Sequence, residues 1–341
     1  MPNSFPELLA EVQAGRDLGR EQVTEAIGEI MTGLRSDEEI GGFLTALAEK
    51  GETVDEIAGA AAAMRRHMTP IRSSRPKLLD TCGTGGDSSG TFNISTAAAI
   101  VVAAAGVPVA KHGNRSVTSK SGSADVLAAL GVNIEADLPL VERCLDELGL
   151  CFCFAPLMHP AMKNVAAVRK RLGIRTVFNL LGPLSNPAGA HCQLLGVGKP
   201  ELRPMLAAAL AALGAERALV VCGDDSLDEV SLATTTSGTS VSPGGLEDFR
   251  WKPEDFGINS APLDTLRVSG PEESAAVIRG ILAGEPGPPR DIVLLNAAAG
   301  LIAAQETDDP QEAAARCAEV LDTGAAKDLL ARLKEMTAAS A

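Results

Sequence analysis

A glycine-rich loop followed by hydroxyl and basic side chains is the part of the sequence best suited to chemistry. Residues 83–87 (GTGGD) follow a short apolar strand signal at 78–81, and glycines without a Cβ let a ligand approach the backbone closely. Residues 93–96 (NIST) open an apolar helix whose free N–H groups and positive dipole end suit an anion. A second strand signal at 107–110 leads into the basic loop 111–115 (KHGNR). This order predicts a site for a polyphosphate-carrying substrate.

The glycine loop taken alone is weak evidence, because a GTGG run is also typical of a tight turn. It does not match the GxGxxG or P-loop patterns, since Ser88 follows Asp87 and no Gly-Lys-Ser/Thr comes at the required spacing. The acidic Asp87 beside the glycines, the hydroxyl-rich helix start and the pair Lys111-His112 after the next strand favour a phosphate site over a plain turn.

Two other clusters of charge could serve the same site. Asp228 and Glu229 come just after a strand signal at 217–222, and adjacent carboxylates are hard oxygen ligands for magnesium. They are equally typical of a solvated acidic turn in an acidic chain. Residues 169–171 (RKR) could recognise a carboxylate, but such a run is also typical of a solvated helix face.

The composition excludes several classes of partner. The 341 residues are enough for two domains or one large one, and 45% hydrophobic residues can form a sizeable core. Only 3% of residues are aromatic, tyrosine is absent, and the net charge is −14. A chain of this kind is a poor partner for nucleic acid or for an anionic membrane surface, so a site for a phosphorylated substrate must be a local basic spot.

The seven cysteines predict a reducing compartment. Their number is odd, no C-x-x-C occurs, and most lie among apolar neighbours, as is typical of buried free thiols. The N-terminal sequence has no signal-peptide pattern, and apolar runs such as 97–106 are too short to span a bilayer. We therefore expect a cytoplasmic protein.

The first part of the chain predicts helices only. Helical signals fill residues 4–68, with capping boxes that begin at Ser36 and Thr53. A linker follows at 69–76, where two prolines bracket polar residues.

From residue 78 onward, short strand signals alternate with alanine-rich helices. We expect strands at 78–81, 107–110, 150–154, 193–197 and 217–222, and helices near 94–105, 123–130, 138–148, 160–172 and 201–213. This alternation predicts an α/β domain with a mainly parallel sheet flanked by helices. An antiparallel strand at 234–242, a turn at 285–289 and helices near 291–304 and 311–335 complete the prediction.

Six motifs together resemble the anthranilate phosphoribosyltransferase family of tryptophan biosynthesis. They are GTGGD at 83–87, NIST at 93–96, KHGNRS at 111–116, HPAMK at 159–163, RTVFNLLGPL at 175–184, and Asp228-Glu229. Their order and spacing extend the resemblance over residues 5–335. It implies a small N-terminal helical domain (1–72, joined by about 168–187) and an α/β domain (73–341). The segment 168–187 is then expected to pack with the N-terminal helices rather than the sheet. The active site would lie between the domains, and the N-terminal helices would form a homodimer interface.

The resemblance also implies a reaction and a set of site residues. The family moves phosphoribose from 5-phosphoribosyl diphosphate to the amine of anthranilate, with Mg²⁺ (two ions per subunit) and no covalent nucleophile. Residues that match its phosphoribosyl diphosphate site are Gly83, Gly86, Asp87, Thr91, Asn93, Ser95, Thr96, Lys111, Ser119 and Ser123. Those that match its anthranilate site are Gly83, Asn114, Arg169 and His112. Those that match its metal site are Ser95, Asp228 and Glu229.

Some of these assignments leave an ordinary alternative open. Any single serine or threonine of the set could simply cap a helix. His112 could be a structural hydrogen-bonding group rather than a contact to substrate. The family usually has glycine where Ser226 stands, so the conformation of the acidic loop is open as well.

Two other functions compete with the transferase. A nucleoside phosphorylase of related fold would use free phosphate, but the segments 175–183 and 228–229 favour the transferase. A family-like fold without catalysis could bind nucleic acid, which the charge of −14 and the scarcity of aromatic residues disfavour.

Overall fold

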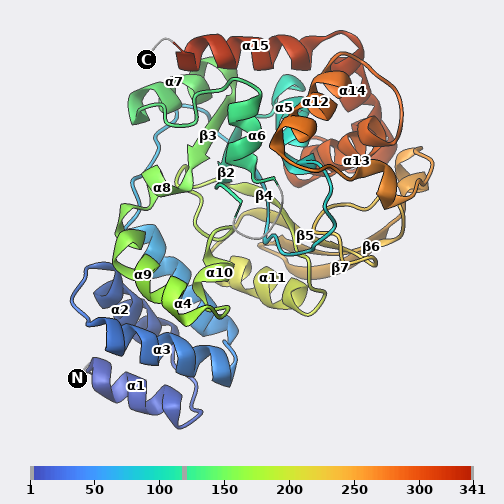
Figure 1. Ribbon diagram of the computed structural model, residues 1–341. Coiled ribbons are helices and arrows are strands. Elements are labelled where there is room, and N and C mark those ends of the chain that lie inside the picture. Colours follow the sequence, from blue (N-terminus) through green and yellow to red (C-terminus); the bar gives the residue numbers. More distant parts are fainter. Residues whose placement is uncertain (1–3, 117–120, 339–341) are drawn as a thin grey trace.

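The computed structural model describes residues 4–116 and 121–338, arranged as a small block of helices beside a larger α/β unit (Figure 1). The strands are β1 (Leu79–Gly83), β2 (Val109–Gly113), β3 (Leu150–Phe154), β4 (Cys192–Gly196), β5 (Arg217–Gly223), β6 (Thr236–Ser242) and β7 (Gly245–Trp251). They form one sheet of order β3-β2-β1-β4-β5-β6-β7. The first five are parallel, whereas β6 and β7 are antiparallel to their neighbours. The predicted fold class, including the antiparallel strand near 234–242, is confirmed.

The helices follow the predicted order with local differences. Their bounds are α1 (Phe5–Gln13), α2 (Arg20–Met31), α3 (Asp37–Lys50), α4 (Val54–Arg66), α5 (Ile94–Ala104), α6 (Ser123–Ala129), α7 (Leu138–Leu148), α8 (Ala155–Met158), α9 (Lys163–Leu172), α10 (Phe178–Leu181), α11 (Leu202–Ala212), α12 (Pro271–Leu282), α13 (Pro288–Ala303), α14 (Pro310–Asp322) and α15 (Ala325–Ala338). Short 3-10 turns lie at Pro160–Met162, Pro253–Phe256 and Leu263–Leu266. In the described part of the chain, no helix has both the length and the apolar character needed to cross a bilayer.

Both predicted capping boxes are present in the helical block. Ser36 Oγ accepts from the Glu39 N–H at 3.3 Å, and the Glu39 carboxylate accepts from the Ser36 N–H at 2.9 Å. Thr53 and Glu56 form the same reciprocal pair at the start of α4. These contacts satisfy N–H groups that the first turn of a helix leaves without partners, so they fix where α3 and α4 begin.

Alternate residues of the central strands serve two different hydrophobic cores. On β5, Leu219 and Val221 join a core with α5 and α13, whereas Ala218 and Val220 join a core with α11 and the N-terminal helices. This is the period of two expected for a strand buried on both faces. Helix α5 lies inside the first core with nearly all its residues buried, so its N-terminal end is held rigidly against the sheet.

The segment 163–187 bridges the helical block and the sheet. Helix α9 packs against α2 and α3, and α10 packs against α4. Residues 182–187 also bond to the strands, because Asn186 Nδ2 donates to Ala110 O at 2.8 Å and Gln193 Nε2 donates to Pro183 O at 2.6 Å. The segment 168–187 was expected to pack with the N-terminal helices and not with the sheet, but its last residues contact both, since the Arg65 Nε of α4 donates to Leu184 O.

Candidate active site

A cavity of about 480 Å³ opens where β1 and β2 end and α5 begins. Strands β2 and β3 lie on one side of β1 in the sheet, and β4 and β5 lie on its other side. The strand order thus reverses between the paired strands β1 and β4. Ligands of open α/β sheets bind outside the carboxyl ends of the strands at such a point.

Most of the residues matched to the family's site line this one cavity. The structure brings together Gly83, Gly86, Asp87, Thr91, Asn93, Ser95, Lys111, His112, Asn114, Ser123, Asp228 and Glu229. Thr96 does not line it, because its side chain is buried and its hydroxyl and N–H both donate to Asn93 Oδ1. Thr96 therefore matches the capping interpretation. Ser119 lies outside the described residues, and Arg169 stands on α9, outside the lining of the cavity.

Glycines let the acidic loop approach the glycine loop closely. The Gly85 N–H donates to Asp228 Oδ2 at 2.9 Å. A Cβ on Gly83 would lie 2.5 Å from Asp228 Oδ2, and one on Gly196 would lie 1.6 Å from the backbone oxygen of Asp228. Real Cβ atoms do not come so near, so the position of Asp228 depends on glycine at both strands. Ser226 adopts φ 65°, the left-handed conformation that the glycine usual in the family would favour.

The N-terminal end of α5 joins the acidic loop to the basic strand. The Ser95 N–H donates to Glu229 Oε1 at 3.1 Å. Lys111 Nζ donates to Ser95 Oγ at 3.2 Å and to Thr81 O at 2.6 Å, with its side chain buried. Hydroxyl, ammonium and carboxylate groups from three separate segments thus meet beside the glycine loop.

The two carboxyl groups of the acidic loop lie in an environment that disfavours their charge. Burial, and then the nearby Asp87, raises the pKa of Asp228 to about 7. Burial and Asp228 raise the pKa of Glu229 well above its usual range. Burial likewise lowers the pKa of Lys111, an effect that the nearby Asp80 opposes. A bound cation would relieve the repulsion between the carboxylates.

The donor set fits magnesium that is shared with a substrate. Within residues 4–116 and 121–338, no three acidic, histidine or cysteine side chains converge to form a complete metal cage. Mg²⁺ is usually held by one or two carboxylates together with substrate phosphates and waters. Asp228, Glu229 and Ser95 Oγ supply that partial set beside an open cavity.

Arg169 differs from its two basic neighbours on α9. Its guanidinium lies 5.6 Å from the centre of the Phe178 ring, and Nη2 is 3.4 Å from Asn179 Oδ1. Partial burial lowers its pKa. Lys170 is exposed, and Arg171 is exposed and pairs with Asp37 at 3.1 Å. Of the three, only Arg169 is held by an aromatic ring and an amide rather than by solvent.

His112 belongs to a buried hydrogen-bonded chain. Its Nδ1 is 3.0 Å from Gly182 O, and its Nε2 is 3.1 Å from Nε2 of His159. Burial lowers the pKa of His112 to about 4 and that of His159 to about 3, so both rings are neutral near pH 7. A carbonyl only accepts, so His112 Nδ1 carries its proton and Nε2 accepts from His159. Both nitrogens of His112 have protein partners, which favours its structural interpretation.

Two residues of the site were missed in the sequence. Asp80 is buried on β1 next to the glycine loop, and its Oδ1 accepts from the His112 N–H at 3.1 Å. An aspartate inside an apolar strand signal could have drawn attention to it. Gly196 ends β4 in a Leu-Leu-Gly-Val-Gly run that resembles any strand end. Its role depends on a contact with Asp228, 32 residues further along the chain (from 196 to 228), for which the sequence holds no local signal.

Several known proteins similar to this chain share the name anthranilate phosphoribosyltransferase. The family model for the glycosyl transferase family, a/b domain, matches residues 75–327, and the one for the helical bundle domain matches residues 6–68. The chain is 49% identical to the anthranilate phosphoribosyltransferase of Symbiobacterium thermophilum over 330 residues, 97% of each chain. It is 48% identical to that of Rhodopirellula baltica over 332 residues, again 97% of each chain.

Solved structures agree with the sequence relatives. The crystal structure of anthranilate phosphoribosyltransferase from Thermus thermophilus matches with a TM-score of 0.91 at 46% identity, covering 96% of this chain and 98% of the other. The enzyme from Saccharomyces cerevisiae in complex with PRPP and Mg matches with a TM-score of 0.89 at 29% identity, covering 98% of each chain. The motifs, the fold and the full-length similarity therefore place the chain in the anthranilate phosphoribosyltransferase family.

Proposed function

We propose that this chain transfers the phosphoribosyl group of 5-phosphoribosyl 1-diphosphate to the amine of anthranilate, giving N-(5-phosphoribosyl)anthranilate and diphosphate. This reaction is the second step of tryptophan biosynthesis from chorismate. The observation that carries the proposal is the meeting of the glycine loop, Lys111 and the pair Asp228-Glu229 in one cavity at the N-terminal end of α5. The full-length relatives named above support it.

The geometry meets the main demand of the reaction, which is the departure of a diphosphate. Backbone N–H groups of Gly86 and Asp87 can donate to phosphate oxygens, and Thr91 and Asn93 can add side-chain contacts. The N–H groups at the start of α5, on residues 93–96, already bond within the protein, contrary to the expectation of free donors there. Lys111 supplies a positive charge, and because its side chain is buried, its attraction for phosphate is screened less by water. Mg²⁺, two ions per subunit in this proposal, neutralises charge on the leaving diphosphate when it is bound with the substrate. The protein needs no covalent nucleophile, because it orients the amine over C1.

We assign the second substrate to the side of the cavity that faces Asn114. Gly83 and Asn114 line it, and Arg169 is proposed to bind the anthranilate carboxylate bidentately. His112 would contribute by holding the wall of the pocket through Gly182.

A direct assay tests the function. The protein is incubated with phosphoribosyl diphosphate, Mg²⁺ and anthranilate, and the loss of anthranilate fluorescence is followed. We expect loss only when all three are present. Phosphorolysis of nucleosides by free phosphate without this activity would instead support the nucleoside phosphorylase. A salt-dependent gel shift without either activity would support nucleic-acid binding.

Replacing Lys111 should affect one substrate selectively. Lys111→Met keeps most of the buried volume but removes the ammonium group, and a hydrogen bond to a charged group is worth roughly 1.5–3 kcal/mol. We expect KM for phosphoribosyl diphosphate to rise about 10- to 100-fold, while KM for anthranilate changes little. Lys170→Met, on the exposed face of α9, is the control. A larger effect on anthranilate would reject the assignment.

Replacing Arg169 should have the opposite selectivity. Arg169→Ala is expected to raise KM for anthranilate by about tenfold or more, because a charge-assisted contact is lost. Arg169→Lys should recover little, since an ammonium cannot supply the two-pronged geometry. Arg171→Ala, which only breaks an exposed pair with Asp37, should behave as wild type. Wild-type anthranilate affinity in Arg169→Ala would show that the residue serves the helix alone.

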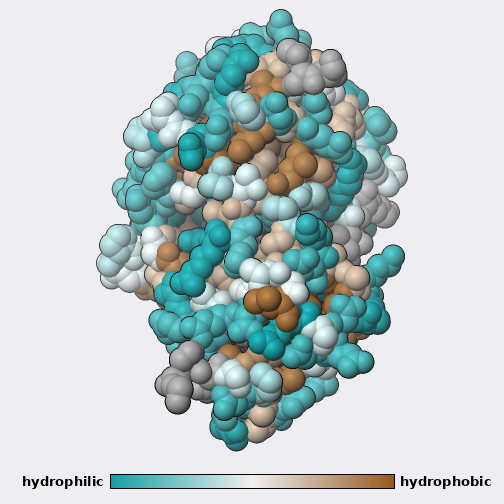
Figure 2. All heavy atoms as spheres, turned by 90° about the vertical axis from the view of Figure 1, so that its left-hand side faces the viewer, coloured by the Kyte–Doolittle hydropathy of each residue, from teal (hydrophilic) through white to brown (hydrophobic). Residues whose placement is uncertain are grey.

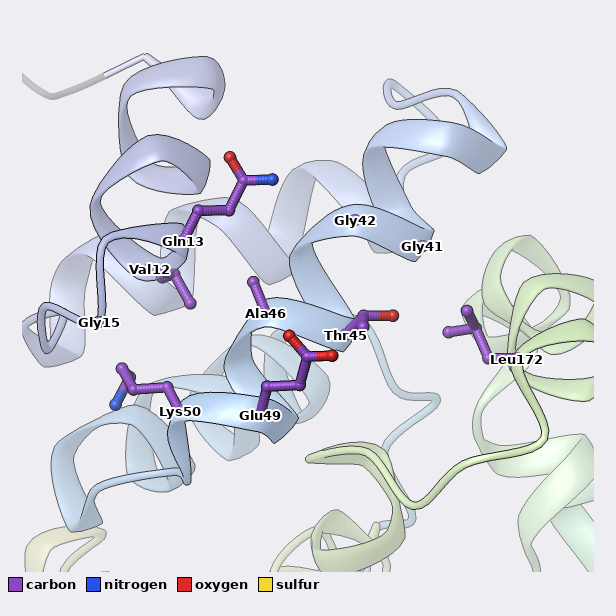
Figure 3. Close-up of a pocket in the computed structure, with 10 residues that line it drawn as sticks. All are labelled: Val12, Gln13, Gly15, Gly41, Gly42, Thr45, Ala46, Glu49, Lys50 and Leu172. Carbon is purple, nitrogen blue, oxygen red and sulfur yellow. The ribbon is translucent and has the colours of Figure 1, made fainter.

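We propose two domains, one made of residues 1–72 with 168–187 and the other of residues 73–341. We also propose that two copies of the chain pair through the N-terminal helices. A groove of about 500 Å³ lies on these helices, lined by α1, α3 and Leu172 (Figure 3). Gly41, Gly42 and Thr45 are small residues in its lining. Figure 2 shows the left-hand side of Figure 1 as a largely polar surface with several apolar patches. Cytoplasmic location stays a prediction.

The pairing can be tested by mass. We expect light scattering to give about twice 35.0 kDa for the wild type and about 35.0 kDa for Thr45→Arg, whose long charged side chain would obstruct the groove. Gln311→Arg, on the exposed face of α14, should leave the mass unchanged. A wild-type mass of a single chain would contradict the proposal.

A further inference from the structure

A second polar pocket lies where β4 and β5 begin, at the opposite end of the parallel strands from the candidate active site. It has a volume of about 150 Å³ and lies between the end of α4, the loop before β4 and the turn that joins α11 to β5. No residue of its lining is shared with the cavity of the active site within the described residues. Its basic side chains are Arg65, His191 and Arg217, against a single acidic one, Glu216.

Arg65 brings a guanidinium into this pocket without a counter-charge. Its Nε donates to Leu184 O at 2.7 Å, and among the described residues no carboxylate lies within 4.0 Å of it. Burial, and then the positive charge of Arg20, lowers the pKa of Arg65. Arg20 itself donates to a backbone oxygen, Ala212 O at 2.5 Å, rather than to an acid. A partly buried guanidinium that lacks an acidic partner and lies near a second positive charge is an unfavourable arrangement.

His191 and Arg217 add two buried nitrogens with unused hydrogen-bonding capacity. His191 Nδ1 and Arg217 Nε are both inaccessible to solvent, and neither has a hydrogen-bond partner among the described atoms. Buried polar groups are normally paired, so these atoms show that two side chains lining the pocket are not fully satisfied by contacts within the protein. Arg217 Nε always carries a hydrogen and His191 Nδ1 can carry one, so each can donate a hydrogen bond to an oxygen.

We propose that this pocket binds a small oxyanion of the phosphate class, held by Arg65, Arg217 and His191. The volume is several times the roughly 30 Å³ that one water takes in the liquid, which is room for a central atom with four oxygens. Guanidinium groups match phosphate oxygens with paired donors. The bound ion would lie against the strands of the active site, because Gln193 lines the pocket and its Nε2 is 3.1 Å from Cys82 Sγ on β1.

Histidine NMR gives a direct readout, because the chain has only four histidines. The full-length protein, labelled at its histidine rings, is titrated with inorganic phosphate at constant ionic strength, with potassium chloride as the balancing salt. His191→Gln assigns the signal. We expect the His191 ring signal to move with saturation in wild type and in Lys111→Met, where any phosphate bound in the active site is weakened. The same titration with acetate in place of phosphate is expected to move it far less.

Substitutions in the pocket should remove this response. Arg217→Gln and Arg65→Gln are each expected to weaken phosphate binding by about tenfold or more, since each deletes a charged donor. Arg143→Gln, which removes an exposed guanidinium from α7, is the matched control and should bind as wild type. If Arg65→Gln does not fold, the phosphate titration of Arg217→Gln tests the proposal by itself. The proposal is overturned if phosphate moves the His191 signal no more than chloride does, or if Arg217→Gln keeps the wild-type response.

Discussion

Asp228→Asn combined with Glu229→Gln is expected to lower kcat by about a thousandfold or more while the fold persists. The two carboxylates are the charged part of the proposed magnesium site, and their loss leaves only the Ser95 hydroxyl as a protein ligand. Loss of a single preorganised electrostatic group in an active site already costs about 10²–10³ in kcat. The amide isosteres keep the volume and the contacts with the Gly85 and Ser95 N–H groups.

The stability of this double variant should move in the other direction. The pKa of Asp228 is raised to about 7, so the folded state holds that proton more tightly than the unfolded chain. Stability from this group is present at low pH and is lost as pH rises through about 7. At pH 8 without Mg²⁺ we therefore expect the variant to have a Tm at or above that of wild type. The buried carboxylates that serve function destabilise the fold, and the neutral amides do not.

A magnesium titration separates the two effects. Turnover of wild type is measured against Mg²⁺ concentration beside the double variant and beside Asp224→Asn. Asp224 is an exposed acid of the same loop that pairs with Arg250 at 2.8 Å, so its variant should keep the wild-type curve. Normal turnover of the double variant at low magnesium would refute a metal role for the pair.

The sequence allowed the fold to be predicted wherever hydrophobic periodicity was strong. The five parallel strands and the five helices expected between them appear within about three residues of their expected places, since buried strands are continuous apolar runs in the sequence. The helix expected at 311–335 is two helices, α14 and α15, because Gly324 adopts φ 78° between them. The turn expected at 285–289 ends sooner, as Pro288 and Pro289 already form the first turn of α13, where proline is favoured.

The short helices α8 and α10 were not predicted, and neither were two longer elements, β7 and α12, which were missed for different reasons. Strand β7 is an edge strand whose residues are mostly exposed, and its apolar alternation is limited to Phe249 and Trp251 at its end. Its charges are typical of a protected edge. Helix α12 did carry a readable signal, since Pro271 opens it and Glu272 and Glu273 lie in its first turn. Hydrophobic periodicity was too limited to reveal β7, whereas the signal for α12 was present and was overlooked.

The site was predictable as a set of motifs but not as a set of contacts. The loop 83–87, the start of α5 and Lys111 lie close in sequence, and their convergence follows from one strand–helix–strand unit. The bond between His112 and His159 joins residues 47 apart, and its role appears only once the chain is folded. Partners that are set by tertiary packing have no fixed spacing in the sequence.

Gly196→Ala is expected to reduce kcat/KM by about a hundredfold through a residue that touches no substrate. Its new Cβ would lie 1.6 Å from the backbone oxygen and 2.4 Å from the backbone carbon of Asp228, which are contacts with main chain rather than with a side chain that can rotate away. The acidic loop must then shift, and with it both carboxylates. A displacement of about 1 Å at a catalytic group can lower the rate by about 10²-fold. The substitution should therefore have a similar but smaller effect than the double variant.

Magnesium dependence distinguishes displacement of the loop from general damage. We expect Gly196→Ala to need more Mg²⁺ for half-maximal turnover and to unfold cooperatively, with stability lowered by about 1–3 kcal/mol as in other overpacked sites. Gly270→Ala is the matched control, because the backbone there is extended at φ 179° and a Cβ would meet no atom within 4 Å. If Gly196→Ala keeps the wild-type magnesium curve, the close approach of β4 does not set the position of Asp228. The acidic loop would then be held by the Gly85 N–H and by the bond between the Val230 N–H and Asn296 Oδ1 instead.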